Sequence, residues 1–210
     1  MSDTGGRGSA DIWLDAAYRA LIDGGLDAVK ILPLASELKI SRTSFYWFFK
    51  DREELLSALA DRWAGKNTGS LVAATQAYAD TEAEAMLNVI GCFLDPSAFD
   101  ARFEFAVRSW ALQSSAMTER VGAADHDRIA ALAAMLERWG HAPLDADVRA
   151  RTIYLVQIGY ISLRSQETLA ERMRRIPTYV EIYTGRMPEA RELARFHARH
   201  GYIPDAERTA

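Results

Sequence analysis

The stretch from Ile31 to Leu56, ILPLASELKISRTSFYWFFKDREELL, limits the possible folds of this chain more than any other segment. Its first apolar side chains recur at the spacing of one buried helix face: Ile31, Leu34, Ala35 and Leu38. Lys39 and Ile40 then form a corner, and the hydroxyl of Ser41 can accept a hydrogen bond from the start of a following helix. The pattern predicts a helix-turn-helix, in which a short turn joins two short helices.

The second of these helices would begin with Arg42, Thr43 and Ser44, whose side chains can hydrogen-bond to base edges in the major groove. A helix-turn-helix reads DNA with this end of its second helix. Nearby groups suit phosphate oxygens, namely Lys39, Tyr46 and Lys50. An ordinary pair of helices in an all-helical protein fits the same periodicity, with the phenylalanines of the segment in the core, so both interpretations stay open at this point.

A longer pattern favours DNA binding. It comprises Leu34-Ala35, Leu38-Lys39-Ile40-Ser41, Phe45 to Lys50 and Arg52 to Leu56. The pattern resembles the DNA-binding signature of the TetR family of bacterial transcriptional regulators, over about residues 11–63. The resemblance implies a three-helix DNA-binding head, an all-helical body for ligand binding and dimerisation, and operator binding as a homodimer. It also implies that Arg42, Thr43 and Ser44 face bases, while Tyr46, Trp47 and Lys50 lie near the DNA backbone.

The chain departs from the family pattern at three positions. Lys39 stands where the family has a turn glycine, so a positive φ there would carry some strain. Lys30 replaces the usual threonine before the first helix of the motif and is a poor cap, and Phe48 replaces a customary histidine. These departures concern the fine geometry of the head.

Composition limits the partners and the location of the protein. The 210 residues carry a net charge of −4, which excludes a wholly basic coat for nucleic acid, so DNA binding requires a local patch. The single cysteine, Cys92, cannot form an intrachain disulfide and indicates a reducing cytoplasm. Neither a signal peptide nor an apolar run of roughly 20 residues is apparent, so we expect no membrane partner.

The order of patterns predicts an all-α protein in four parts. Residues 1–8 form a flexible arm, 9–50 the helix-turn-helix domain, 51–66 a connecting helix capped by Asp51, and 67–210 the body. Helices of the body are expected over 70–78, 81–94, 98–115, 119–139, 145–170 and 189–200, with prolines marking breaks between them. Short links between these helices predict an antiparallel bundle.

Two further sites are expected in the body. A ligand pocket without a bound cofactor or metal would draw on apolar side chains, namely Met86, Ile90, Phe93, Phe103, Val107, Trp110 and Met117. A dimer interface would draw on two apolar stripes, namely Ile129, Leu132, Leu136 and Trp139, and Ile153, Val156 and Tyr160. Either set could instead be ordinary core, and the effector itself is not identified by any pattern.

Other classes of function have weaker support in the sequence. His197 and His200 have a helical spacing seen in metal sites, but no cysteine or carboxylate cluster completes them. Cys92 lies among apolar residues as a buried thiol would, and neither a phosphate-binding glycine loop nor a nucleophile elbow is present. We therefore predict a non-enzymatic, ligand-responsive repressor that binds operator DNA. The alternatives are a helical small-molecule-binding protein without useful DNA binding and a helical enzyme.

Overall fold

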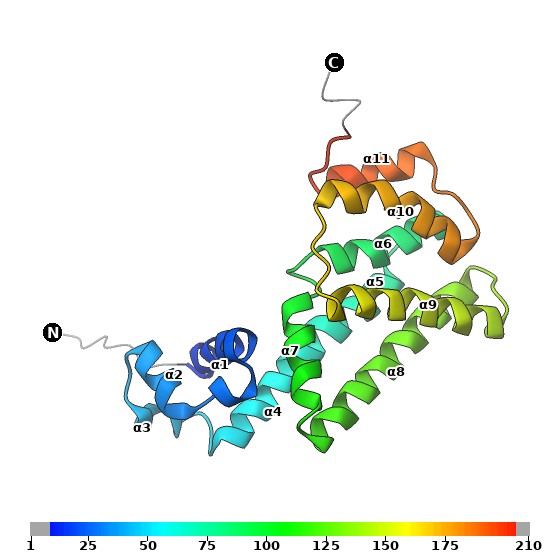
Figure 1. Cartoon of the computed structure of the whole chain (residues 1–210). Helices are drawn as coiled ribbons and strands as arrows, with labels where there is room; N and C mark the ends of the chain where they lie inside the picture. Colours follow the sequence, from blue (N-terminus) through cyan, green and yellow to red (C-terminus); the bar gives the residue numbers. More distant parts are fainter. Residues whose placement is uncertain (1–8, 205–210) are drawn as a thin grey trace. The chain divides into compact units, whose positions relative to one another are not determined.

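The computed structural model describes residues 9–204, and all regular structure in that part of the chain is helical (Figure 1). The predicted arm, residues 1–8, lies outside the described residues. The chain divides into two compact units. Unit 1 comprises the described residues up to Gly65 together with Arg102–Val121, and unit 2 comprises Lys66–Ala101 and the described residues from Gly122 onward. The sequence placed all of 67–210 in one body, whereas residues 102–121 group with the N-terminal unit.

Unit 1 holds the predicted head. Its helices are α1 (Ala10–Gly24), the 3₁₀ turn η1 (Leu26–Ala28), α2 (Ile31–Leu38), α3 (Arg42–Phe45), α4 (Arg52–Trp63), α7 (Ala101–Ala111) and the first turns of α8 (Ser115–Arg138). Trp13 of α1 packs edge-on against Phe45 of α3, with ring centroids 5.1 Å apart. The indole of Trp63 donates a 2.7 Å hydrogen bond to the buried carboxylate of Glu104, which ties α4 to α7. Burial of these aromatic rings holds the short helices of the head together.

Unit 2 is arranged around α6 (Glu82–Leu94), which packs against three other helices. These are α5 (Gly69–Gln76), α10 (Leu169–Thr184) and α11 (Ala190–Arg199); α9 (Pro143–Ser162) packs against α10, and α8 completes the unit. Met86 and Val89 of α6 are fully buried in the core of this unit. The π-helical turn η2 (Ala64–Thr68) leads from α4 into α5 and contains the division between the two units.

The largest error in a predicted helix boundary is at the end of the helix expected over 145–170, and one helix was missed. The helix expected over 145–170 ends at Ser162, and α10 occupies a stretch that Pro177 had appeared to interrupt. Pro177 lies inside α10, where it removes one backbone donor. A capping box between Thr168 and Glu171 starts this helix. Buried side chains along the helix stabilise it by tertiary packing, which the rule that proline interrupts a helix does not take into account.

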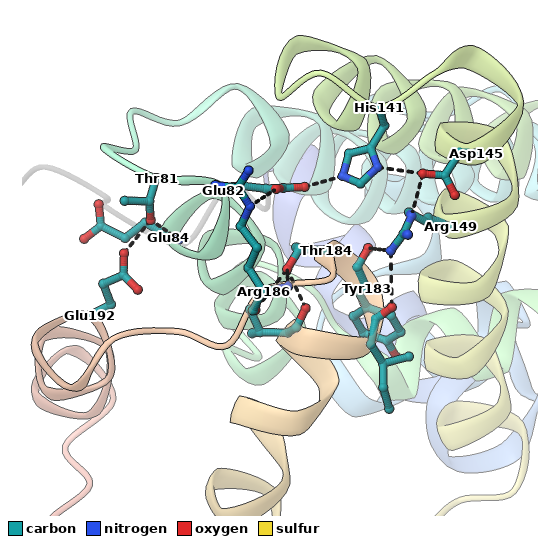
Figure 2. A network of polar contacts seen from close by, with 12 residues as sticks. Thr81, Glu82, Glu84, His141, Asp145, Arg149, Tyr183, Thr184, Arg186 and Glu192 are labelled. Atoms are coloured by element: carbon teal, nitrogen blue, oxygen red, sulfur yellow. Dashed lines mark hydrogen bonds and ion pairs between the residues drawn. The ribbon is translucent and has the colours of Figure 1, made fainter.

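A polar network joins the ends of three helices in unit 2 (Figure 2). The imidazole of His141 contacts Glu82 at the start of α6 through Nε2 and Asp145 in the first turn of α9 through Nδ1. Asp145 also accepts a 2.9 Å hydrogen bond from Arg149, whose guanidinium donates to the carbonyl of Tyr183 at the end of α10, 3.0 Å away. The network therefore fixes the starts of α6 and α9 and the last turn of α10.

No helix between residues 9 and 204 is long and apolar enough to cross a membrane.

Candidate nucleic-acid interface and effector pocket

The corner between α2 and α3 is closed as the sequence predicts. Lys39 adopts a left-handed conformation, with φ 55° and ψ 38°, and the N–H of Ile40 donates to the carbonyl of Ala35 at 3.1 Å. This pattern ends α2 as a Schellman-type motif does. The hydroxyl of Ser41 then accepts a 3.1 Å hydrogen bond from the N–H of Thr43 and caps α3.

Two of the three residues predicted to face bases lie on the surface. Arg42 and Thr43 are exposed at the start of α3. Ser44 is only 9% exposed, and its hydroxyl donates a 2.7 Å hydrogen bond to the carbonyl of Ser41. Ser44 therefore stabilises the corner from inside, and we leave it out of the base-reading set that we propose below.

The residues predicted to contact the DNA backbone are all on the surface. Tyr46 and Trp47 are 49% and 68% exposed, and Lys39 and Lys50 are exposed as well. The side chains of Lys39, Arg42 and Lys50 form no ion pair with any residue that the structure describes. They are thus available for phosphate oxygens or base edges, since charge-assisted hydrogen bonds to such groups are the strong ones.

One exposed cation near α3 escaped the sequence analysis as a candidate DNA contact. Lys30 precedes α2 and lines a shallow groove with Leu32, Arg42 and Tyr46. The sequence marked Lys30 only as a poor cap, and it indeed makes no capping hydrogen bond with its side chain. Its neighbour in the groove, Arg52, instead donates hydrogen bonds to main-chain carbonyls of the segment before α2.

A cavity of about 50 Å³ lies in unit 2 among α6, α9 and α10. Its apolar lining comprises Ile90, Phe93, Leu94, Ile153, Val156 and Ile176, and its polar lining comprises Gln157, Tyr160, Arg172, Arg175, Tyr179 and Tyr183. Two of the seven predicted pocket residues, Ile90 and Phe93, line it. Met86 is buried in the core of unit 2 beside them, and the other four belong to unit 1, namely Phe103, Val107, Trp110 and Met117.

Three of the seven residues predicted for a dimer interface are buried within the single chain. Leu132, Leu136 and Ile153 are buried in the core of unit 2. The remaining four, Ile129, Trp139, Val156 and Tyr160, are half-buried. The opposite side of α9 carries exposed apolar side chains instead, namely Leu144, Val148 and Leu155, followed just after the helix by Leu163.

The groups weighed for other chemistry are not assembled into a site in the described part of the chain. No group of three or more histidine, cysteine or acidic side chains among residues 9–204 could hold a metal ion. Burial raises the pKa of the Cys92 thiol to about 11, and burial lowers the pKa of His200. Both groups are therefore mainly neutral at neutral pH.

The described residues therefore have the architecture of a helix-turn-helix domain, with exposed cations around its second helix. Residues 14–59 match the family model described as bacterial regulatory proteins, tetR family. No curated protein sequence matches the chain.

Solved structures resemble the chain over nearly its whole length. AmtR from Mycobacterium smegmatis superposes with a TM-score of 0.61 at 17% identity, covering 97% of this chain and 100% of that one. A transcriptional regulator of the TerR/AcrR family from Aquifex aeolicus VF5 gives a TM-score of 0.54 at 18% identity, covering 85% of this chain and 96% of that one. The chain therefore has the DNA-binding domain and the fold of a TetR-family transcriptional regulator.

Proposed function

We propose that the chain is a repressor that binds a palindromic operator as a homodimer and is released from it by a small-molecule effector. The observation that carries the proposal is the surface formed by Arg42, Thr43, Tyr46, Trp47 and Lys50 around a capped α3 in a domain of the tetR family. Arg42 and Thr43 would read base edges, and Lys39, Tyr46, Trp47 and Lys50 would contact the DNA backbone. Binding to an operator requires the cytoplasm, which we propose as the location.

The homodimer that we propose uses the outer side of α9. Leu144, Val148 and Leu155 follow one another at intervals of four and seven residues, which places them on one face of the helix. Each is more than half exposed in the single chain, as is Ile182 on α10. Burying such a face against its symmetry mate would form a self-complementary interface. Two recognition helices could then enter successive major grooves, roughly 34–36 Å apart.

The effector would act through the segments that pass from unit 2 into unit 1. One is the π-helical turn η2 between α4 and α5, and the other is α8, which belongs to unit 1 up to Val121 and to unit 2 beyond it. π-Helical turns interrupt regular helices and are frequent at functional sites. An effector bound in unit 2 would shift these segments and thereby change the spacing of the two DNA-binding heads.

The test of this function is binding of the full chain to the DNA upstream of its own gene. Footprinting should protect a palindrome, and fluorescence anisotropy should show affinity that falls steeply with salt, because phosphate contacts release counterions. Arg42→Ala should relax the preference for the operator over unrelated DNA, with a cost of roughly 1–3 kcal/mol on the operator alone. Lys50→Ala should weaken binding to both DNAs about equally and reduce the salt slope by roughly one.

If Arg42→Ala, like Lys50→Ala, lost as much affinity for unrelated DNA as for the operator, the assignment of Arg42 to base reading would be wrong. An absence of any salt-dependent, sequence-specific binding would overturn the proposed function.

A further inference from the structure

The cavity among α6, α9 and α10 contains polar side chains that have no hydrogen-bond partner among the described residues. Within residues 9–204, the carboxamide of Gln157 and the hydroxyl of Tyr183 make no hydrogen bond, although the two residues are only 9% and 6% exposed. Neither group is among the buried side-chain atoms without a hydrogen-bond partner, so their polar atoms reach the space of the cavity. A ligand that enters the cavity can therefore form hydrogen bonds with them in place of water.

The charge beside this cavity is positive. Arg175 forms an ion pair with Glu167, which neutralises it. The guanidinium of Arg172 lies over the ring of Tyr160, 5.5 Å from its centroid, and has no carboxylate partner among the described residues. The hydroxyls of Tyr160 and Tyr179 satisfy each other at 2.9 Å. Arg172 is thus the unneutralised charge of the wall and would attract an anionic group and repel a cation.

The remainder of the wall is apolar. Ile90, Phe93, Ile153 and Ile176 contribute side chains from all three helices and offer no hydrogen-bonding groups of their own. The hydroxyl of Tyr183 remains protonated at neutral pH, because burial raises the pKa of this phenol, and it can therefore donate a hydrogen bond. The cavity thus combines a cation, a hydroxyl donor and a carboxamide with a hydrocarbon surface.

We propose that this cavity binds a small monocarboxylate with an apolar tail, whose carboxylate pairs with Arg172 and accepts from Tyr183 or Gln157. The proposal rests on the proposed function, since it names the chemical class of the effector. The volume of about 50 Å³ holds a carboxylate and its first carbons. A longer tail requires rotation of Tyr160 and Arg172, which are only half-buried.

Isothermal titration calorimetry on the full chain tests this chemistry with hexanoate and benzoate as probes. Hexanamide and benzamide are the neutral counterparts of the same size. Both the acids and the amides fit an apolar cavity, but only the acids pair with a guanidinium. At least one acid should bind, about tenfold or more tightly than its amide.

Variants identify the charge that is responsible. Arg172→Gln should weaken binding of the acid about tenfold or more, and Tyr183→Phe should weaken it severalfold by removing only a hydroxyl. Arg174→Gln is the matched control, because Arg174 is an exposed arginine on the same helix and does not line the cavity. This control should retain the affinity of the parent protein. Circular dichroism should confirm that all three variants fold.

Three results would overturn the inference: no heat of binding with either acid at millimolar concentration, equal affinity for acid and amide, or equal losses in Arg172→Gln and Arg174→Gln. Operator binding is measured separately on the same protein. If the chain binds its operator but neither acid, the inference alone fails. If it binds an acid in the predicted manner but no DNA, the proposed function fails and the ligand site stands.

Discussion

Lys39 departs from the residue pattern of the tetR family but keeps the backbone geometry that a glycine would adopt at this corner. A left-handed conformation at the corner between α2 and α3 suits glycine, and a side chain with a Cβ adopts it only with strain. In the complex with DNA that we propose, its exposed ammonium group would compensate by contacting a phosphate. At position 39, glycine would therefore favour the stability of the fold, and lysine would favour affinity for DNA.

Lys39→Gly should raise the free energy of unfolding by about 1 kcal/mol, because it relieves the left-handed strain. The same change should weaken binding to all DNA sequences about equally through loss of one phosphate contact. Urea unfolding and fluorescence anisotropy measure the two effects. Lys39→Ala is the control, since it removes the charge and keeps the Cβ; a matching gain in stability with Ala would rule out the backbone explanation.

His141 makes the stability of unit 2 depend on pH. Burial of the imidazole opposes its charge, but hydrogen bonds to Asp145 and Glu82 outweigh this effect and raise the pKa of His141 above its ordinary value of 6.5. The nearby guanidinium of Arg149 acts in the opposite direction, and Arg186 lies 3.8 Å from Glu82. The folded chain consequently holds the proton of His141 more tightly than the unfolded chain does.

The contribution of His141 should be fully present below pH 6.5 and should be lost as the pH rises through the raised pKa. Urea unfolding between about pH 6 and pH 8 measures this loss. His141→Asn should flatten the corresponding part of the profile, because asparagine does not titrate. A parent protein and a variant with identical slopes in this range would contradict the assignment.

In the head, the structural role of a residue could be predicted from the sequence where it depends only on neighbouring residues in the chain. The caps by Ser41 and Asp51 and the positive φ of Lys39 all follow from sequence position, and all are present. The burial of Ser44 was not predictable, because its hydrogen bond to the carbonyl of Ser41 exists only once the corner has formed. Similarly, tertiary packing decides that Arg175 pairs with Glu167, whereas Arg172 lies over the ring of Tyr160 and has no carboxylate partner among the described residues.

At the scale of the element, α3 is short and depends on its cap. Only four residues, Arg42–Phe45, are helical, so the hydrogen bond from Thr43 to Ser41 is a large share of its local stabilisation. Buried Phe45 and Phe49 attach this segment to the rest of the head. Residues 46–48, which follow this helix directly, form turns.

Ser41→Ala should lower the free energy of unfolding by about 1 kcal/mol and weaken operator binding, because α3 loses its side-chain cap. Ser41→Gly should cost only a few tenths of a kcal/mol in stability. Ser41→Thr keeps a hydroxyl at the capping position and serves as the control. Chemical unfolding and fluorescence anisotropy measure the two quantities. Equal stability of the Ala and Thr variants would show that the cap contributes little.

α9 illustrates why the sequence could not separate core from surface. Apolar residues occur on two sides of this helix, so periodicity alone gives two candidate stripes. Ile153 and Tyr154 are buried in the core, whereas Val148 and Leu155 are exposed at the surface. The choice between the two sides depends on where α6 and α10 lie, which is tertiary information.

At the scale of the whole molecule, the sequence predicted an all-helical chain in four consecutive parts, whereas the described residues form two compact units. Residues 102–121 group with the head because Trp63 bonds to Glu104 and Arg120 pairs with Asp61. Neither interaction has a local signal, since each joins residues far apart in the chain. The helix-turn-helix, by contrast, is contained in one continuous stretch and was predictable in type.

The proposed dimer gives a prediction for the whole molecule. Leu155→Glu places a charge in the middle of the exposed apolar face of α9, where each subunit would meet its mate, so two like charges would be brought together and desolvated. The variant should be a monomer by light scattering at a concentration where the parent is a dimer. Its affinity for the full palindrome should fall at least tenfold, because two linked heads bind far more tightly than one.

The control for this variant is Leu112→Glu, which changes an equally apolar side chain that is 88% exposed and lies outside α9. This variant should remain a dimer and retain its affinity for the palindrome. Binding to a single half-site separates the two possible causes of a loss, since it requires only one intact head. Leu155→Glu should bind the half-site as the parent does; a monomeric parent, or a dimeric Leu155→Glu, would place the subunit contact elsewhere.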